Sequence, residues 1–109
     1  MLYLYQDLII QNLKRHAKED KNLHQIIIYG SFARNEHRPE SDIDILIITD
    51  DILESERIFS KFRNNIYLET SVIMSFQYLR PLEYANRKDP FMNQIKKEGK
   101  IIWSINKTI

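Results

Sequence analysis

The sequence predicts an α+β fold in which helices cover a mixed β-sheet. Short runs of β-branched and aromatic residues alternate with segments whose apolar residues recur every three or four positions. A content of 43% hydrophobic and 28% charged residues is typical of a globular chain. With 109 residues there is material for one sheet and a few helices, so we expect residues 1–109 to form a single domain.

The N-terminal half contains a helix and two strands in this interpretation. Apolar residues at helical spacing predict a helix over 2–18. The apolar run 25–29 ends at a glycine and is typical of a buried strand. We expect one helical turn over 31–34, a polar loop over 35–41 and a second strand over 42–49.

The C-terminal half is predicted to alternate in the same way. A helix over 51–64 begins with an aspartate that resembles an N-cap, and a third strand follows over 66–74. A loop or short helix comes next and is interrupted at Pro81. The last helix starts at Asp89-Pro90 and stops at Gly99, and residues 101–103 form a closing strand.

Composition excludes several classes of function. The formal net charge is +1, which does not favour direct binding of nucleic acid. Cysteine is absent, so disulfides and thiolate metal sites are excluded. No apolar run approaches the ~20 residues of a membrane helix, and the first residues do not resemble a signal peptide. We therefore expect a cytoplasmic protein without membrane contact.

Two acidic residues form the most informative pattern in the chain. Asp42 and Asp44 open the second predicted strand and share one of its faces, because side chains alternate along a strand. Two such charges repel each other by on the order of a few kcal/mol, and a divalent cation such as Mg²⁺ would remove that cost. An isolated Asp-x-Asp is usually a solvated strand end. Here Gly30 and Ser31 end the preceding strand, and this combination favours a metal-dependent phosphate site.

Residues near the glycine are candidates for phosphate contacts. Gly30 allows a tight turn, and Ser31 could offer a hydroxyl at the start of a helical turn, although a plain N-cap role is the alternative. Arg34 lies on the same side of that turn, and Ser41 precedes the acidic pair. With only two glycines, the chain has neither a Walker A loop nor a dinucleotide-binding glycine fingerprint.

These residues resemble the motif of the minimal nucleotidyltransferases (MNT-type) of the DNA polymerase β superfamily. That motif is Gly-Ser, ten residues, then Asp-x-Asp, and here it runs from Gly30-Ser31 to Asp42 and Asp44. The resemblance implies transfer of a nucleoside monophosphate, usually AMP from ATP, to a hydroxyl acceptor with two Mg²⁺ ions. It implies that Gly30, Ser31, Arg34 and Ser41 bind the nucleotide, and that both aspartates bind metal and act in catalysis.

The family resemblance also implies a third carboxylate on the next strand, which we place over 66–74. Aligning the apolar residues puts Ser71 at that position, and a serine could not act as a base. Glu69, two residues earlier on the same predicted face, is the nearby acid. Either Glu69 is the third catalytic and metal-binding carboxylate, or this ligand is lost.

The resemblance further implies a partner protein. Larger relatives carry a helical domain that holds the acceptor, and stand-alone MNT proteins commonly pair with a helical HEPN-type protein as antitoxin and toxin. Two alternatives stay open: a catalytically degenerate antitoxin or binding module that acts by contact, and one chain of a two-chain small-molecule nucleotidyltransferase. Homo-oligomerisation is also open. We expect an exposed apolar docking surface beside the site, with candidates within 76–92, some of which must belong to the core of so small a domain: Phe76, Tyr78, Leu79, Tyr84, Phe91 and Met92.

Overall fold

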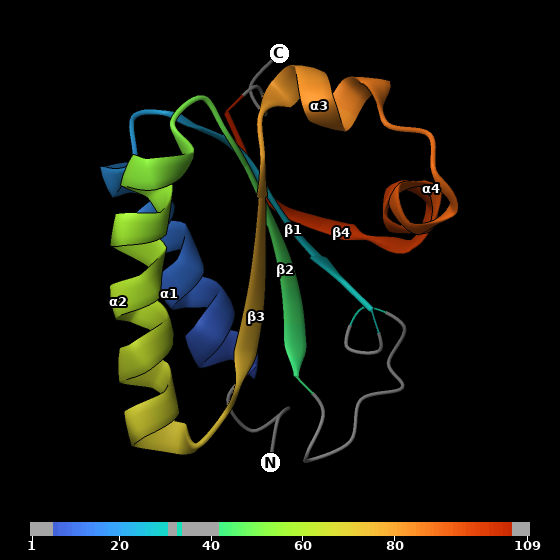
Figure 1. Ribbon diagram of the computed structural model, residues 1–109. Helices are drawn as coiled ribbons and strands as arrows, with labels where there is room; N and C mark the ends of the chain where they lie inside the picture. Colours follow the sequence, from blue (N-terminus) through green and yellow to red (C-terminus); the bar gives the residue numbers. More distant parts are fainter. Residues whose placement is uncertain (1–5, 31–32, 34–41, 106–109) are drawn as a thin grey trace.

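The computed structural model describes residues 6–30, 33 and 42–105, and these form four helices and four strands (Figure 1). In chain order the elements are α1 (Gln6–Glu19), β1 (Leu23–Tyr29), β2 (Ile43–Thr49), α2 (Ile52–Thr70), β3 (Met74–Leu79), α3 (Pro81–Asn86), α4 (Pro90–Glu98) and β4 (Lys100–Ser104). No helix of this described part has both the length and the apolar character needed to cross a membrane.

The strands form one mixed sheet in the order β3-β2-β1-β4, which confirms the predicted α+β class. β1 pairs antiparallel with both β2 and β4, whereas β2 and β3 run parallel. The register sets Asp44 of β2 opposite Tyr29 of β1 on one side and opposite Ser75 of β3 on the other. Three neighbouring strands therefore contribute residues to the same place on the sheet.

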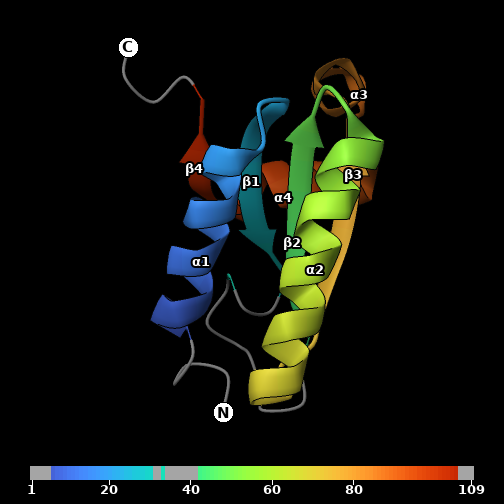
Figure 2. The same ribbon diagram turned by 90° about the vertical axis from the view of Figure 1, so that its left-hand side faces the viewer.

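Helices cover the two faces of the sheet in pairs (Figures 1 and 2). α1 and α2 lie on one face, where Leu13 and Phe59 pack with Ile45 in a fully buried core. α3 and α4 lie on the other face, where Met92 and Ile95 pack with Leu46 and other residues of β1 and β2. Asp44 belongs by strand alternation to this second face, which has the smaller core.

Side-chain caps and proline set the helix starts that the sequence predicts. The Asp51 carboxylate accepts a hydrogen bond from the backbone N–H of Glu54 at 3.1 Å, as an N-cap does. Asp89 accepts from the backbone N–H of Met92 at 3.3 Å, with Pro90 as the first residue of α4. Gly99 follows the last helical residue, as expected.

The predicted strand over 66–74 is wrong. Residues up to Thr70 continue α2, and β3 begins only at Met74. Phe59, Phe62 and Ile66 recur at helical spacing and are all buried, so burial of this stripe outweighs the β-branched and aromatic character of the segment. The helix ends at Ser71, whose φ of 63° lies in the left-handed region that glycine usually occupies at a C-cap.

Candidate functional site

Gly30 and Asp44 lie in direct contact across β1 and β2. Gly30 ends β1 with a φ of 75°, a conformation that favours glycine. A Cβ atom added at Gly30 would collide with the Oδ2 atom of Asp44, and the Cγ atom of Asp44 would lie only 3.3 Å from it. The glycine is therefore required both by its backbone angle and by the carboxylate that fills the space beside it.

Asp42 is connected to the same place through β3. The Ser75 hydroxyl donates a hydrogen bond to Oδ2 of Asp42 at 3.0 Å, and Ser75 is the register partner of Asp44. Asp42 is exposed and Asp44 is half-buried, so the two carboxylates stand at the rim where β2 enters the sheet. Gly30 and Asp44 are thus in contact, and Asp42 is linked to the strand that flanks Asp44, whereas Ser31, the other member of the predicted group, lies outside the described residues.

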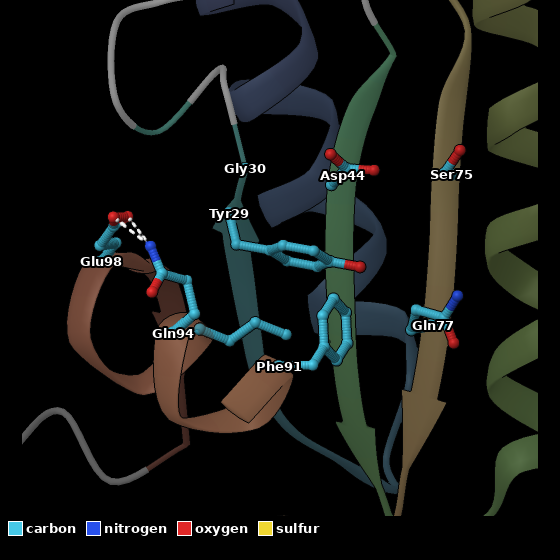
Figure 3. Close-up of a pocket in the computed structure, with 9 residues that line it drawn as sticks. Tyr29, Gly30, Asp44, Ser75, Gln77, Phe91, Gln94 and Glu98 are labelled. Carbon is cyan, nitrogen blue, oxygen red and sulfur yellow. Dashed lines mark hydrogen bonds between the residues drawn. The ribbon is translucent and has the colours of Figure 1, made fainter. Parts of the chain in front are cut away.

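Asp44 of this rim also lines a cavity of about 520 Å³ between the sheet and α4 (Figure 3). The sheet contributes Tyr29, Gly30, Asp44, Ser75 and Gln77, and α4 contributes Phe91, Gln94, Ile95 and Glu98. The amide nitrogen of Gln94 donates to both carboxylate oxygens of Glu98, at 2.5 and 2.6 Å. No lysine, arginine or histidine is present among these lining residues, which all belong to the described part of the chain.

The Tyr29 ring lies between the acidic rim and α4 (Figure 3). It packs edge-on against Phe91, with ring centroids 5.9 Å apart and an interplanar angle of 84°. Burial, with a further contribution from the negative charge of Asp44, raises the pKa of the Tyr29 phenol to about 12. Tyr29 is therefore a neutral hydrogen-bonding group at ordinary pH and does not add charge to the rim.

Several predicted site residues are not found beside Gly30 and the two aspartates. Ser31, Arg34 and Ser41 lie outside the described residues. The expectation that Glu69 is a third carboxylate beside the aspartates is wrong, because Glu69 is exposed on α2 rather than on the third strand. Within the described ranges, which include all three acids, no group of three His, Cys, Asp or Glu side chains could hold a metal ion.

The position beside Asp44 on the third strand is occupied by Ser75, which the sequence interpretation missed. The sequence does contain a pattern that indicates this strand, because apolar and polar residues alternate over 74–79 with the period of a strand. Met74 and Phe76 pack toward the helices α1 and α2, whereas Ser75 and Gln77 line the cavity on the opposite face. Ser71, the other candidate for this position, is the C-cap of α2.

The donor set fits one nucleotide-bound divalent cation. Magnesium in phosphate sites is typically held by one or two carboxylates together with substrate phosphates and water. Asp42 and Asp44 supply two carboxylates at a rim, and the space beside Gly30 is taken up by the Asp44 carboxylate, so Gly30 brings that ligand close to the end of β1. Ser75 supplies a hydroxyl where a third carboxylate would serve a second ion, so the described residues fit the two-ion arrangement less well.

The fold and the motif at this rim define a nucleotidyltransferase, and the family comparison agrees. A family model described as Polymerase beta, Nucleotidyltransferase matches residues 11–108. The chain belongs to this family.

Among individual proteins, one named relative matches only part of the chain. A segment of 39 residues is 49% identical to a Methanocaldococcus jannaschii protein named "Putative protein adenylyltransferase MJ0126". This match spans 36% of the chain and 40% of that relative, which is well under two thirds of its length.

Solved structures share the fold at low sequence identity. A crystal structure of a toxin-antitoxin with AMP-PNP has a TM-score of 0.64 at 15% identity, over 89% of this chain and 74% of that one. A mutant of the toxin-antitoxin MntA-HpeT gives 0.62 at 15% identity, with the same shares. A "putative nucleotidyltransferase" from Sulfolobus solfataricus gives 0.60 at 21% identity, over 93% of this chain and 81% of that one. These structural matches support the same fold over about nine tenths of the chain.

The expected apolar surface within 76–92 is formed only in small part. Phe91 is 51% exposed, whereas Met92 is buried in the second core. The other four predicted residues, Phe76, Tyr78, Leu79 and Tyr84, are half-buried against the two cores. Phe91 is therefore the exposed member of these six candidates, and the expected patch of at least two exposed together is not formed.

Proposed function

We propose that this chain binds a magnesium–nucleoside triphosphate at the Gly30–Asp42–Asp44 rim and transfers a nucleoside monophosphate, AMP from ATP, to a hydroxyl of a partner protein. The observation that carries the proposal is the contact of Asp44 with Gly30 at the end of β1. Asp42 is held near them by the hydrogen bond from Ser75, the register partner of Asp44. This arrangement gathers negative charge for a cation at the end of β1, and the triphosphate would bind there through that cation.

The chemistry follows from these groups. The acceptor oxygen would bond to the α-phosphorus, the bond from that phosphorus to the β-phosphate bridging oxygen would break, and pyrophosphate would leave. When bound, Mg²⁺ neutralises the phosphate charge and favours ionisation of the acceptor hydroxyl. The two aspartates would hold the triphosphate through that charge, and the acceptor proton would pass to water, since Ser75 is not a base.

The antitoxin role belongs to the same proposal. Structural neighbours of this chain are toxin-antitoxin complexes, one of them crystallised with AMP-PNP. We propose that the acceptor is a helical HEPN-type protein and that modification neutralises it. Incubating the protein with labelled ATP, Mg²⁺ and the product of the adjacent gene tests this directly. Label should appear on the partner and should disappear with Asp42→Asn plus Asp44→Asn.

Ser75 favours a second candidate, a nucleotide-binding antitoxin that acts by contact without transfer. The same labelling assay separates the two when Ser75→Asp is added, with Ser75→Asn as the matched uncharged control. Transfer by the wild type supports the enzyme. The contact mechanism is supported if only Ser75→Asp transfers label while the wild type still neutralises the partner. That result overturns transfer by the wild type.

A further inference from the structure

We infer that the α4 side of the cavity is the nucleoside-binding end of the site, with the Phe91 ring as the platform for the base. The inference rests on the proposed nucleotide-binding function and assigns the part of the cavity that this function leaves unused. The acidic rim takes up the cation and the phosphates. The remainder of the lining is mostly apolar or uncharged, with Glu98 as its one acidic group, and is formed by Tyr29, Gln77, Phe91, Gln94, Ile95 and Glu98.

Phe91 has the exposure and support that a stacking platform needs. Its side chain is 51% exposed although it lines a cavity, whereas its helix neighbours Met92 and Ile95 are 1% and 2% exposed. The edge-to-face contact with Tyr29 supports the ring on one side. An aromatic ring with open area can stack on a nucleobase, and such contacts do not require an exact hydrogen-bond pattern.

The polar groups near the ring also suit a neutral ligand. Gln77 on β3 and Gln94 on α4 stand on opposite walls of the cavity (Figure 3). The Gln94 amide nitrogen donates to Glu98, which leaves its amide oxygen as an acceptor, and rotation of the Gln77 side chain can bring a second amide to base edges or sugar hydroxyls. Because the described lining carries no cationic side chain, this end offers nothing to a phosphate. Glu98 would repel one. The uncharged nucleoside is the part of the nucleotide that fits here.

The cavity is continuous from the rim to the platform. Gly30 and Asp44 lie on one side of the Tyr29 ring and Phe91 lies on the other, and all four line the same cavity of about 520 Å³ (Figure 3). A single bound nucleotide can therefore reach both ends. Its triphosphate would lie at the strand ends and its base against α4.

Calorimetry with three magnesium-loaded probes tests the assignment: ATP, CTP and inorganic tripolyphosphate. Phe91→Ala should weaken MgATP binding roughly tenfold, the effect of losing one base–aromatic stack. It should weaken MgCTP less, and leave Mg-tripolyphosphate unchanged. Phe91→Leu, which keeps apolar bulk without a ring, should behave like Phe91→Ala. Leu82→Ala, at a 74% exposed position on α3 outside the cavity lining, is the matched control.

The outcomes separate this inference from the proposed function. The nucleoside assignment alone is overturned if the wild type binds MgATP, the binding needs the two aspartates, and neither Phe91 substitution weakens it. Equal weakening of all three probes overturns it as well, because Phe91 would then support the whole site. If the wild type binds none of the probes, the proposed function itself fails. A thermal melt of each variant verifies that the fold is retained.

Discussion

The substitution Gly30→Ala should destabilise the protein through two separable effects. An alanine at a φ of 75° costs about 1–2 kcal/mol in free energy of unfolding, because its Cβ is poorly accommodated in the left-handed region. The same Cβ collides with Oδ2 of Asp44, and overpacking of this kind costs roughly 1–3 kcal/mol more. Their sum, about 2–5 kcal/mol, is a large part of the stability of a small domain.

A double-mutant cycle with Asp44→Ala separates the two effects. Removing the Asp44 carboxylate leaves its Cβ as the nearest remaining contact, 3.6 Å from the added atom, which is an ordinary van der Waals distance. In the Asp44→Ala background the alanine at position 30 should therefore cost only the backbone term. We expect a favourable coupling of at least about 1 kcal/mol between the two substitutions, read from urea denaturation of the four variants.

Gly99→Ala provides the control for this cycle. Its added Cβ would lie 2.6 Å from Cγ2 of Ile27 and from the carbonyl oxygen of Ile95, so it should also destabilise the protein. Asp44 takes no part in that clash, and Gly99→Ala with Asp44→Ala should be additive. If the free energies of Gly30→Ala and Asp44→Ala are additive as well, the claim that the Asp44 carboxylate occupies the space beside Gly30 is refuted.

Three further predictions concern the site. Asp42→Asn plus Asp44→Asn should abolish Mg²⁺-dependent binding of ATP with little loss of stability; equal affinity with and without Mg²⁺ in the wild type would contradict this. Tyr29 has a pKa of about 12 when folded and near 10 when unfolded, so its stabilising contribution is complete below pH 10 and is lost as the pH rises toward 12. Tyr29→Phe should show a smaller fall between urea denaturation at pH 9 and pH 11; an identical fall would contradict the shift. Ser75→Asp should raise transfer activity and Ser75→Asn should not, as measured by labelling of the partner.

The sequence predicts the rim well because short-range rules determine it. A strand that ends just before Gly30 and a neighbouring strand that begins between Asp42 and Asp44 bring these groups together once the two strands pair. The same holds for the helix starts at Asp51 and Asp89, where a capping side chain acts within one turn of its helix.

The opposite wall of the cavity depends on longer-range contacts and was less predictable. Residues 66–73 have strand-like composition, yet burial of Phe62 and Ile66 against the sheet extends α2 through Thr70. That extension moves the third strand to residues 74–79 and replaces Glu69 with Ser75 at the position beside Asp44. A helix without a glycine stop offers no local signal for its end.

Ser75 changes the electrostatic balance of the rim as well as its chemistry. A carboxylate at this position would face both Asp42 and Asp44, and each repulsion between like charges about 4 Å apart costs on the order of 1–4 kcal/mol at a solvated protein surface. The serine hydroxyl instead donates a hydrogen bond to Asp42, so the rim carries less unfavourable energy before any cation binds. Ser75→Asp should accordingly lower the melting temperature without Mg²⁺, and adding Mg²⁺ should recover more of it than in the wild type or in Ser75→Asn. A cation that binds the native rim would stabilise the fold by mass action, so this difference measures how much a third carboxylate would strengthen such binding. An unchanged response to Mg²⁺ would mean that Ser75 does not face the shared rim.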